Sequence, residues 1–249
     1  MKFTVDMLRQ SKGRFRIAAL TAYDYPTARL LSEAGVHLIL VGDSLGMVVL
    51  GYPDTTAVTM ADMEHHTRAA ARAQPQSLLA ADMPFGSYRD ASLAVANAAR
   101  LIQAGAEAVK AEGGREMAEP FRAIREAGIP LIGHIGMLPQ RIREEKRYRI
   151  KGRTEAEKTD LLSDAEFLAE AGAVAIVLEL VDPPVAAEIS QRIPVPTIGI
   201  GSGPDCDGQI LVFNDLVGTF PWFTPRFVKP RLQAFELMRA AVIAWRESL

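Results

Sequence analysis

The amino-acid sequence predicts an α/β fold of the (β/α)8 TIM-barrel class in a single domain over residues 1–249, and three observations lead to this prediction. The chain has 249 residues, which is close to the usual length of an eight-stranded α/β barrel. Eight short apolar runs recur along it, and most are continuous rather than alternating, as is typical of parallel strands buried on both faces. Amphipathic segments with helical spacing separate these runs, which predicts right-handed βαβ units. An open doubly wound sheet is the alternative, because the last run is weakly marked.

The expected strands and helices alternate regularly in chain order. The strands are expected at 15–22, 37–43, 77–82, 107–112, 130–135, 173–179, 196–200 and 210–213. The clearest helices are expected at 27–34, 60–73, 90–104, 116–127, 155–171 and 184–192. Four helices finish at an Ala-Gly pair, because glycine readily takes the left-handed conformation that ends a helix; these glycines are Gly35, Gly105, Gly128 and Gly172. A last helix is expected over 226–248, either packed on the outside of the barrel or used as an oligomer contact.

Two connections are longer than the rest. Segment 44–60 follows the second expected strand, and segment 138–153 follows the fifth and is strongly basic. Long connections in a compact domain are often lids or binding loops. The alternative for 138–153 is a solvated, mobile surface loop, and the sequence favours neither interpretation.

Composition and charge exclude several classes of protein. The net charge of −2 gives no support for binding nucleic acid or an anionic membrane surface. The single cysteine, Cys206, cannot form an internal disulfide, which fits a reducing compartment. No apolar run has the length of a signal peptide or a membrane span. We therefore expect a soluble, cytoplasmic protein.

Charged or titratable side chains stand at the ends of five expected strands: Asp43, Asp82, Glu112, His134 and Glu179. The carboxyl ends of parallel strands face one mouth of a barrel, where active sites lie, so we expect these side chains to converge. Asp43, Asp82 and Glu112 are hard oxygen donors without a nearby Cys/His pattern, which favours Mg²⁺ over Zn²⁺. The alternative is that each acid caps a helix or forms an ion pair in a loop.

Other residues near these strand ends suggest acid–base and binding roles. Lys110 and Glu112 are two apart, so both point to the same face of their strand. Glu179 lies between two leucines, and apolar surroundings raise a carboxyl pKa toward that of a general base. A structural ion pair is the alternative for Glu179, and a packed neutral imidazole is the alternative for His134. Ser44 and adjacent N–H groups can hold a substrate carboxylate, although a plain turn also explains that residue.

Motifs along nearly the whole chain resemble those of the ketopantoate hydroxymethyltransferase (3-methyl-2-oxobutanoate hydroxymethyltransferase) family. They occur in the family's order: TAYDYPTARLL (21–31), VGDSLGMVVLGY (41–52), VTMADMEHHTRA (58–69), LLAADMPFGSY (78–88), AVKAEGG (108–114), IGHIGMLPQ (132–140), IVLELV (176–181), IGIGSGPDCDGQILV (198–212) and PRFVK (225–229). The combination of VGDSLG, ADMPFGSY and VKxEGG is highly specific.

The resemblance implies a (β/α)8 barrel that transfers a hydroxymethyl group from 5,10-methylenetetrahydrofolate to 3-methyl-2-oxobutanoate. The product is 2-dehydropantoate, on the route to pantothenate and coenzyme A. The metal expected is one Mg²⁺, which would stabilise an enolate in aldol-type chemistry. The family commonly assembles as a homodecamer of two stacked pentamers.

The resemblance also implies roles for residues of this sequence. The metal ligands would be Asp43, Asp82 and Glu112. The substrate would contact Asp43, Ser44, Asp82, Lys110 and His134. Glu179 would be the proton acceptor.

The sequence departs from the family pattern mildly at GIGSG (199–203), where the family has GIGAG, and most clearly in the connection after the fifth expected strand. The usual Gly-Leu-Thr-Pro-Gln-Ser reads Gly-Met-Leu-Pro-Gln-Arg at 136–141, and the following segment lacks the usual glycine-rich character. Two alternative functions follow from the sequence. One is a Mg²⁺-dependent lyase or mutase of the isocitrate lyase and phosphoenolpyruvate mutase group, although the Lys-Lys-Cys-Gly-His segment of the lyases is absent. The other is a barrel that kept the site but is not catalytic.

Overall fold

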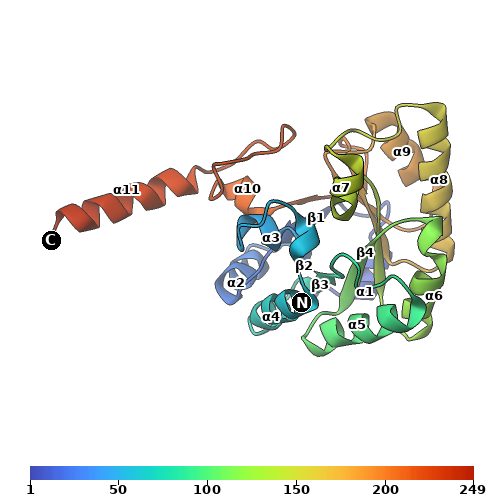
Figure 1. Ribbon diagram of the computed structural model, residues 1–249, viewed down its shortest axis with the longest axis horizontal. Helices are drawn as coiled ribbons and strands as arrows, with labels where there is room; N and C mark the ends of the chain where they lie inside the picture. Colours follow the sequence, from blue (N-terminus) through green and yellow to red (C-terminus); the bar gives the residue numbers. More distant parts are fainter.

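The eight strands of the chain form one closed parallel barrel, in chain order from β1 to β8. The structure is a computed structural model that describes all residues, 1–249 (Figure 1). The strands are β1 (Ile17–Thr21), β2 (Leu38–Val41), β3 (Leu78–Asp82), β4 (Ala108–Glu112), β5 (Leu131–Gly136), β6 (Ala175–Glu179), β7 (Thr197–Ile200) and β8 (Gly208–Leu211). The barrel prediction is confirmed, and the open sheet is excluded because β1 pairs with β8. The last strand begins and ends two residues earlier than expected.

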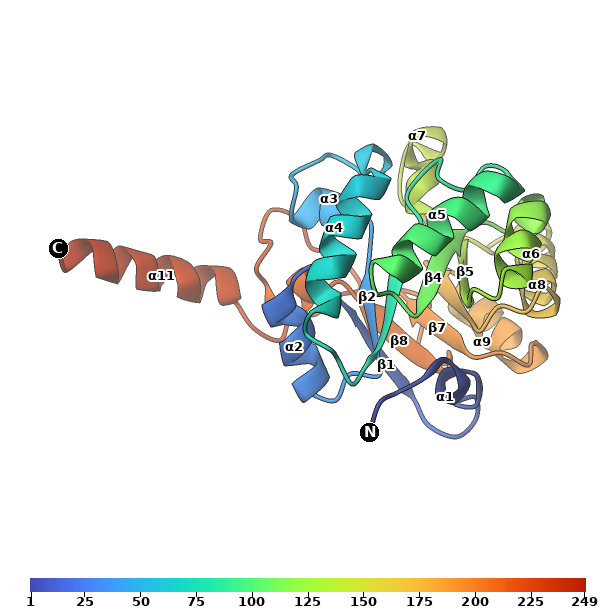
Figure 2. The same cartoon turned by 90° about the horizontal axis from the view of Figure 1, so that it is seen from below.

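Helices surround the strands, as the two cartoon views show (Figures 1 and 2). The α-helices that precede α11 are α1 (Val5–Arg9), α2 (Tyr25–Glu33), α3 (Leu45–Val48), α4 (Met60–Ala71), α5 (Ala91–Gln103), α6 (Ala118–Glu126), α7 (Ile142–Glu145), α8 (Glu155–Glu170), α9 (Pro183–Arg192) and α10 (Phe213–Val217). Short 3-10 turns lie at Thr55–Ala57, Arg115–Met117 and Pro139–Arg141. The four glycines expected to end helices all have positive φ angles. None of the helices is both long enough and apolar enough to cross a membrane.

Alternate residues of each strand belong to two different apolar clusters. In β2, Leu38 and Leu40 belong to a cluster inside the barrel, while Ile39 and Val41 belong to the larger cluster between strands and helices. Side chains of a strand point alternately to its two faces, so both faces of this sheet are covered by apolar groups. This explains why the strands read as continuous apolar runs in the sequence.

One end of the barrel is closed by the N-terminal segment. Phe3 and Leu8 of that segment are buried in the interior cluster, and the Phe3 amide donates a hydrogen bond of 2.7 Å to the Gln76 carbonyl just before β3. Figure 2 shows α1 beside this end of the strands. The carboxyl ends of the strands form the opposite mouth, which leaves that end for a binding site.

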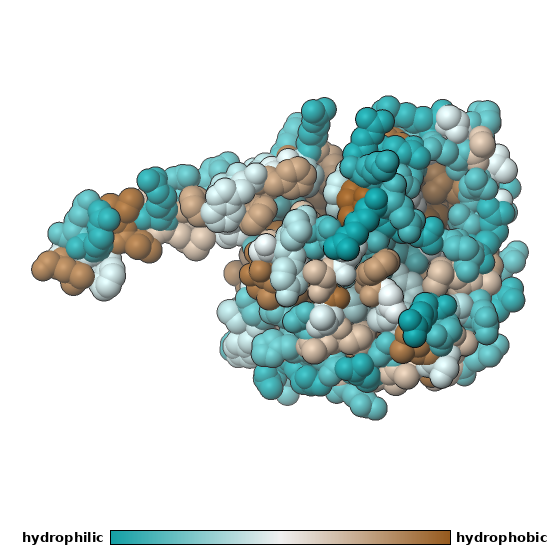
Figure 3. All heavy atoms as spheres, in the orientation of Figure 1, coloured by the Kyte–Doolittle hydropathy of each residue, from teal (hydrophilic) through white to brown (hydrophobic).

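The final helix, α11 (Ala234–Glu247), extends away from the barrel and has no buried residue (Figure 1). The expectation that it packs on the outside of this barrel is wrong, and it starts later than 226. Leu237, Met238, Val242 and Trp245 on it are all more than half exposed. Figure 3 shows such apolar side chains on the projecting helix. The alternative interpretation, an oligomer contact, is consistent with this exposure.

Candidate active site

The predicted strand-end residues continue the rows of side chains that point into the barrel. In β4, Ala108 is part of the interior cluster, so Lys110 and Glu112, at two-residue steps, point the same way. By the same alternation, Asp82 points inward like Ala80, and Glu179 points inward like Val177. The polar site is therefore the last layer of the barrel interior, at the carboxyl ends of the strands.

Strand register brings these residues into adjacent pairs. Asp82 lies opposite Lys110, Glu112 opposite His134, and Gly136 opposite Glu179. At Gly136 the φ angle is +103°, and a Cβ atom would lie 2.2 Å from the Glu179 carbonyl oxygen. This close approach allows the Met137 amide to donate a 2.8 Å hydrogen bond to that oxygen. Glycine at position 136 thus holds the end of β6 against β5.

A cavity of about 1040 Å³ opens over this layer. Its lining includes all seven predicted site residues: Asp43, Ser44, Asp82, Lys110, Glu112, His134 and Glu179. The two long connections contribute Met47, Val48 and Thr55 from one and Tyr148 and Arg149 from the other. Segment 138–153 therefore borders the cavity, which favours a binding loop over a detached surface loop.

Asp82 is the centre of the charged cluster. One of its oxygens, Oδ1, accepts a 2.6 Å hydrogen bond from Lys110 Nζ, and the other, Oδ2, accepts a 2.9 Å bond from the Asp43 amide. Both partners of the Asp82–Lys110 ion pair are buried. Burial opposes the charged form of Lys110, but Asp82 and the other two carboxylates more than offset this and raise the Lys110 pKa. The lysine is therefore held as a cation among three carboxyl groups.

Gln140 connects two of the carboxylates, a contact that the sequence motifs did not predict. Its side-chain Nε2 donates to Asp43 Oδ2 at 2.8 Å and to the Met83 carbonyl at 2.9 Å. Its backbone amide donates to Glu112 Oε2 at 3.1 Å. Its Oε1 accepts a 2.6 Å bond from the Tyr88 hydroxyl. Both residues lie in motifs noted above, but their type alone gave no signal of this buried role.

His134 lies between two carboxylates. Its Nδ1 is 3.4 Å from Glu112 Oε1, and its Nε2 is 3.3 Å from Glu179 Oε2. Both separations are long for hydrogen bonds, and neither nitrogen makes a well-directed one. Burial and Lys110 lower the His134 pKa, but contacts with Glu112 and Glu179 outweigh them and raise it to about 9. The flanking carboxylates favour the charged imidazole, and the packed neutral imidazole stays the alternative.

A tyrosine supports the serine of the second strand end. The hydroxyls of Tyr23 and Ser44 lie 2.9 Å apart. Burial is the largest cause of a raised Tyr23 pKa, so its hydroxyl stays protonated. Tyr23 lies in the first motif of the sequence but was not among the predicted site residues.

The carboxylate cluster suits a divalent cation. Burial, followed by repulsion from Asp82 and Glu112, raises the pKa of Asp43 well above its usual value. Glu112 Oε1 is buried and has no hydrogen bond. No group of three or more His, Cys, Asp or Glu side chains is arranged to hold a metal ion. Mg²⁺ commonly takes one or two carboxylates and completes its octahedron with water and substrate, so this donor set fits it.

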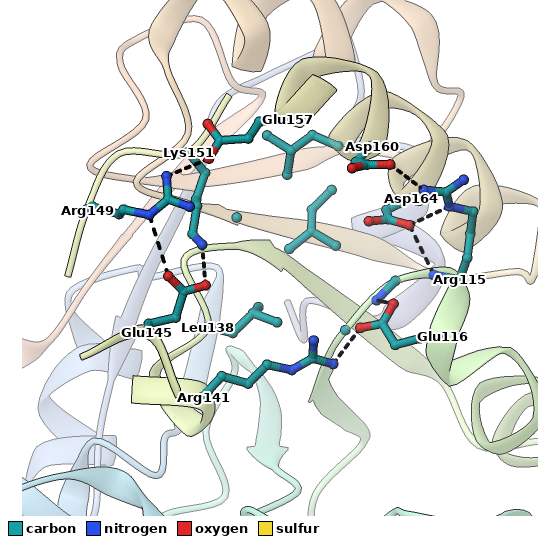
Figure 4. A pocket seen from close by; sticks show the side chains of 15 residues that line it. Arg115, Glu116, Leu138, Arg141, Glu145, Arg149, Lys151, Glu157, Asp160 and Asp164 are labelled. Carbon is teal, nitrogen blue, oxygen red and sulfur yellow. Dashed lines mark hydrogen bonds and ion pairs between the residues drawn. The ribbon is translucent and has the colours of Figure 1, made fainter. Parts of the chain in front are cut away.

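Ion pairs fix segment 138–153 beside a second hollow of about 600 Å³ (Figure 4). Glu145 forms ion pairs with Lys151 and Arg149. Arg149 also forms an ion pair with Glu157 of α8 at 2.6 Å. On the other side, Arg141 pairs with Glu116 after β4. Each arginine or lysine in this hollow faces an acid. The departures from the family pattern thus form a salt-bridged connection rather than a glycine-rich one.

Comparison with known families and proteins agrees with the motifs. The model of the ketopantoate hydroxymethyltransferase family matches residues 2–249. This chain belongs to that family. A 3-methyl-2-oxobutanoate hydroxymethyltransferase of Ignicoccus hospitalis is 50% identical over 98% of this chain and 93% of its own length. Those of Aeropyrum pernix and Thermus thermophilus are 52% and 48% identical, each over 100% of this chain and over 90% and 95% of their own lengths.

Solved structures share the fold at much lower identity. A putative phosphonomutase from Burkholderia cenocepacia J2315 has a TM-score of 0.71 at 17% identity, covering 96% of this chain and 97% of its own. A 2,3-dimethylmalate lyase, described as a PEP mutase/isocitrate lyase superfamily member, has a TM-score of 0.65 at 17% identity and covers 99% and 89%. At this identity, the similarity to these structures shows only a shared barrel fold. Membership of the ketopantoate hydroxymethyltransferase family separates this chain from the lyase and mutase alternative.

Proposed function

We propose that this chain transfers a hydroxymethyl group from 5,10-methylenetetrahydrofolate to 3-methyl-2-oxobutanoate, giving 2-dehydropantoate for pantothenate and coenzyme A biosynthesis. Family membership supports the reaction class. The observation that carries the proposal is the single buried layer in which Asp43, Asp82 and Lys110 lie beside the Glu112–His134–Glu179 row. One half of this layer suits a chelating 2-oxo acid, and the other half suits proton transfer.

Asp43 and Asp82 would hold a Mg²⁺ ion, and Glu112 would be the third carboxylate ligand of the site. Bound there, the ion would polarise the substrate carbonyl and stabilise negative charge on its oxygen. The excess of carboxylates over cations in this buried cluster supports the assignment. Gln140 supports this site by donating hydrogen bonds to two of the three carboxylates, Asp43 and Glu112.

The remaining residues would bind the oxo acid and move its proton. Lys110 and the Ser44 hydroxyl supply donors for its carboxylate and keto oxygens. Glu179 accepts the proton from C3, and its side chain keeps 14% of its area exposed toward the cavity. His134 lies against the accepting carboxylate and stabilises its charge.

The reaction balances with one water. Loss of the C3 proton gives a carbanion equivalent, which forms a carbon–carbon bond with the one-carbon unit. Tetrahydrofolate leaves, and the oxygen of water becomes the hydroxyl of the new CH₂OH group. Both folate C–N bonds to the one-carbon unit break, and the two folate nitrogens take up the proton removed from C3 and the second proton of the water.

A product assay tests the proposal. The protein is incubated with Mg²⁺, 3-methyl-2-oxobutanoate and methylenetetrahydrofolate, and 2-dehydropantoate is measured by mass spectrometry. We expect product that depends on Mg²⁺, and at least a roughly 100-fold loss of turnover with Asp82→Asn, since a ligand and the partner of Lys110 both change. No product from well-folded wild-type protein would exclude the proposed function.

We further propose that the protein acts in the cytoplasm as a homo-oligomer, with the decamer typical of the family as the expected form. The exposed apolar side chains of α11 support association, because such surfaces usually mark contacts. The net charge of −2 gives no reason to expect nucleic acid as a partner.

A further inference from the structure

Asp215 is a buried carboxylate that the proposed chemistry does not use. It lies in α10, directly after β8, and is 8% exposed. It lines the same cavity as the catalytic layer. Burial alone shifts its pKa, with no contribution from a hydrogen bond or a nearby cation, whereas the other buried acids of the cavity all have such contacts. Its oxygens accept no hydrogen bond from the protein, so this mostly buried carboxylate is available to a ligand in the cavity.

Aromatic side chains from the segment after α10 form part of the wall of the same cavity as Asp215. Phe220, Phe223 and Phe227 all line the cavity, and all three follow α10 in the chain. Phe227 packs so closely on the end of β7 that a Cβ atom on Gly201 would lie 2.9 Å from its ring. Phe223 is 55% exposed although it lines the cavity. Open aromatic faces beside a cavity suit a flat ligand ring.

The cavity extends beyond what the oxo acid requires. The catalytic layer occupies the ends of β2 to β6, whereas Asp215 and the three phenylalanines come from the segment after β8. Asp215 nevertheless lies near Tyr23, whose pKa its charge helps to raise. Tyr23 in turn contacts Ser44. The aromatic wall is therefore joined to the catalytic layer rather than being a separate hollow.

We propose that Asp215 and this aromatic wall bind the pterin ring of the folate co-substrate, with the carboxylate accepting hydrogen bonds from the 2-amino group and N3–H. This inference rests on the proposed function and assigns the co-substrate end of the same site. The two pterin donors lie side by side on one edge of the ring, so they match the two oxygens of a carboxylate. The ring faces match the phenylalanine wall. The opposite edge of the pterin carries N5, which would then point toward the oxo acid.

The chemistry of Asp215 and the aromatic wall favours a pterin ring over other ligands of this cavity. A second oxo acid or a phosphate is an anion, and an unpaired buried carboxylate would repel it. A metal ion would need further acidic ligands beside Asp215, and no neighbouring charge contributes to the shift of the Asp215 pKa. A flat ring with two adjacent N–H donors satisfies both the carboxylate and the wall.

The test compares Asp215→Asn with the matched control Asp205→Asn, an exposed residue outside the cavity. Tetrahydrofolate binding is measured by calorimetry with Mg²⁺ present, together with the KM values for both substrates. We expect Asp215→Asn to weaken tetrahydrofolate binding and to raise the KM of methylenetetrahydrofolate by roughly 10- to 100-fold, since it removes a charged acceptor. The KM of the oxo acid and the control variant should stay within about twofold of the wild type.

A ligand variant supplies a second measurement, made on the wild type and on Asp215→Asn. A tetrahydrofolate analogue without the 2-amino group should bind wild-type protein roughly 10- to 100-fold more weakly, and Asp215→Asn should discriminate little between the two ligands. Exchange of the C3 hydrogen of the oxo acid without folate should be unchanged in Asp215→Asn. Normal exchange with unaltered folate binding in Asp215→Asn, or no discrimination by the wild type, would overturn the pterin assignment. Absence of exchange in the wild type would instead reject the proposed function.

Discussion

At the scale of single residues, the site depends on groups that hold the carboxylates as well as on the carboxylates themselves. Gln140 is 4% exposed and donates to two carboxylates, one through its side chain and one through its backbone. The Tyr88 hydroxyl donates to Gln140 Oε1, which fixes the amide orientation so that Nε2 faces Asp43. Gln140 is therefore a positioning residue, since it acts on the substrate only through Asp43 and Glu112.

We predict that Gln140→Ala raises the Mg²⁺ concentration needed for half-maximal activity by roughly 10- to 100-fold, because residues that orient metal ligands commonly have effects of this size. Tyr88→Phe, which removes one hydrogen bond but keeps the amide, should have a smaller effect in the same direction. Metal binding measured by calorimetry gives a second readout besides activity. A folded Gln140→Ala protein with unchanged Mg²⁺ affinity would contradict this role.

Asp215 predicts a dependence of stability on pH. Burial raises its pKa from 3.8 to about 6, so the folded state holds this proton more tightly than the unfolded chain does. Stability from this group is therefore highest below about pH 4 and falls as the pH rises through about 6. Asp215→Asn should increase the free energy of unfolding at about pH 7 by at most about 3 kcal/mol, and by almost nothing at about pH 3.5.

Urea unfolding of both proteins at the two pH values measures this difference. A variant that is less stable than the wild type at neutral pH would show that Asp215 has a stabilising partner in the fold. A carboxylate kept at a cost in stability is what a ligand-binding role predicts.

At the scale of elements, the strands were predicted well and the connections were not. Continuous apolar runs and the Ala-Gly ends of helices located the strands to within about two residues, because burial on both faces leaves a strong pattern. The five strand-end side chains were expected to converge, and all five line one cavity. No local pattern indicated that Gln140 of one connection would reach Asp43, which is 97 residues away. Such contacts depend on strand register and on the path of a loop.

The connection at 138–153 is held by pairs that converge on Glu145. We predict that Glu145→Gln weakens its contacts with Lys151 and Arg149 and increases the rate of tryptic cleavage within 141–153 several-fold. Because Tyr148 and Arg149 line the cavity, substrate KM values should rise as well. Glu144→Gln is the matched control, since Glu144 is exposed and makes no ion pair. Equal cleavage rates for the two variants would show that Glu145 does not fix the segment.

At the scale of the whole molecule, α11 is the feature that the barrel does not explain. The sequence predicted a helix in this tail, but only the structure shows that it lies away from its own barrel (Figure 1). The sequence could not decide this, because an apolar helix face fits a barrel of the same chain or of another copy equally well. The apolar residues of α11 remain exposed in a single chain.

We predict that the full chain is oligomeric and that a chain ending at residue 233 forms a smaller assembly, because it lacks the apolar face of α11. The barrel itself should still fold, since α11 contributes no buried residue to it. Light scattering with size-exclusion chromatography gives the mass, and circular dichroism checks the fold. A monomeric full chain, or an unchanged mass after truncation, would contradict this account of α11.

The most direct test of the central claim is deuterium exchange at C3 of 3-methyl-2-oxobutanoate in D₂O, followed by NMR without any folate. Proton removal by Glu179 beside a Mg²⁺ site predicts exchange that requires Mg²⁺ and falls at least roughly 100-fold in Glu179→Gln. Glu170→Gln, a change at the end of α8 on the outside of the barrel, is the control and should exchange at the wild-type rate. Exchange that persists in Glu179→Gln, or that is independent of Mg²⁺, would contradict the account.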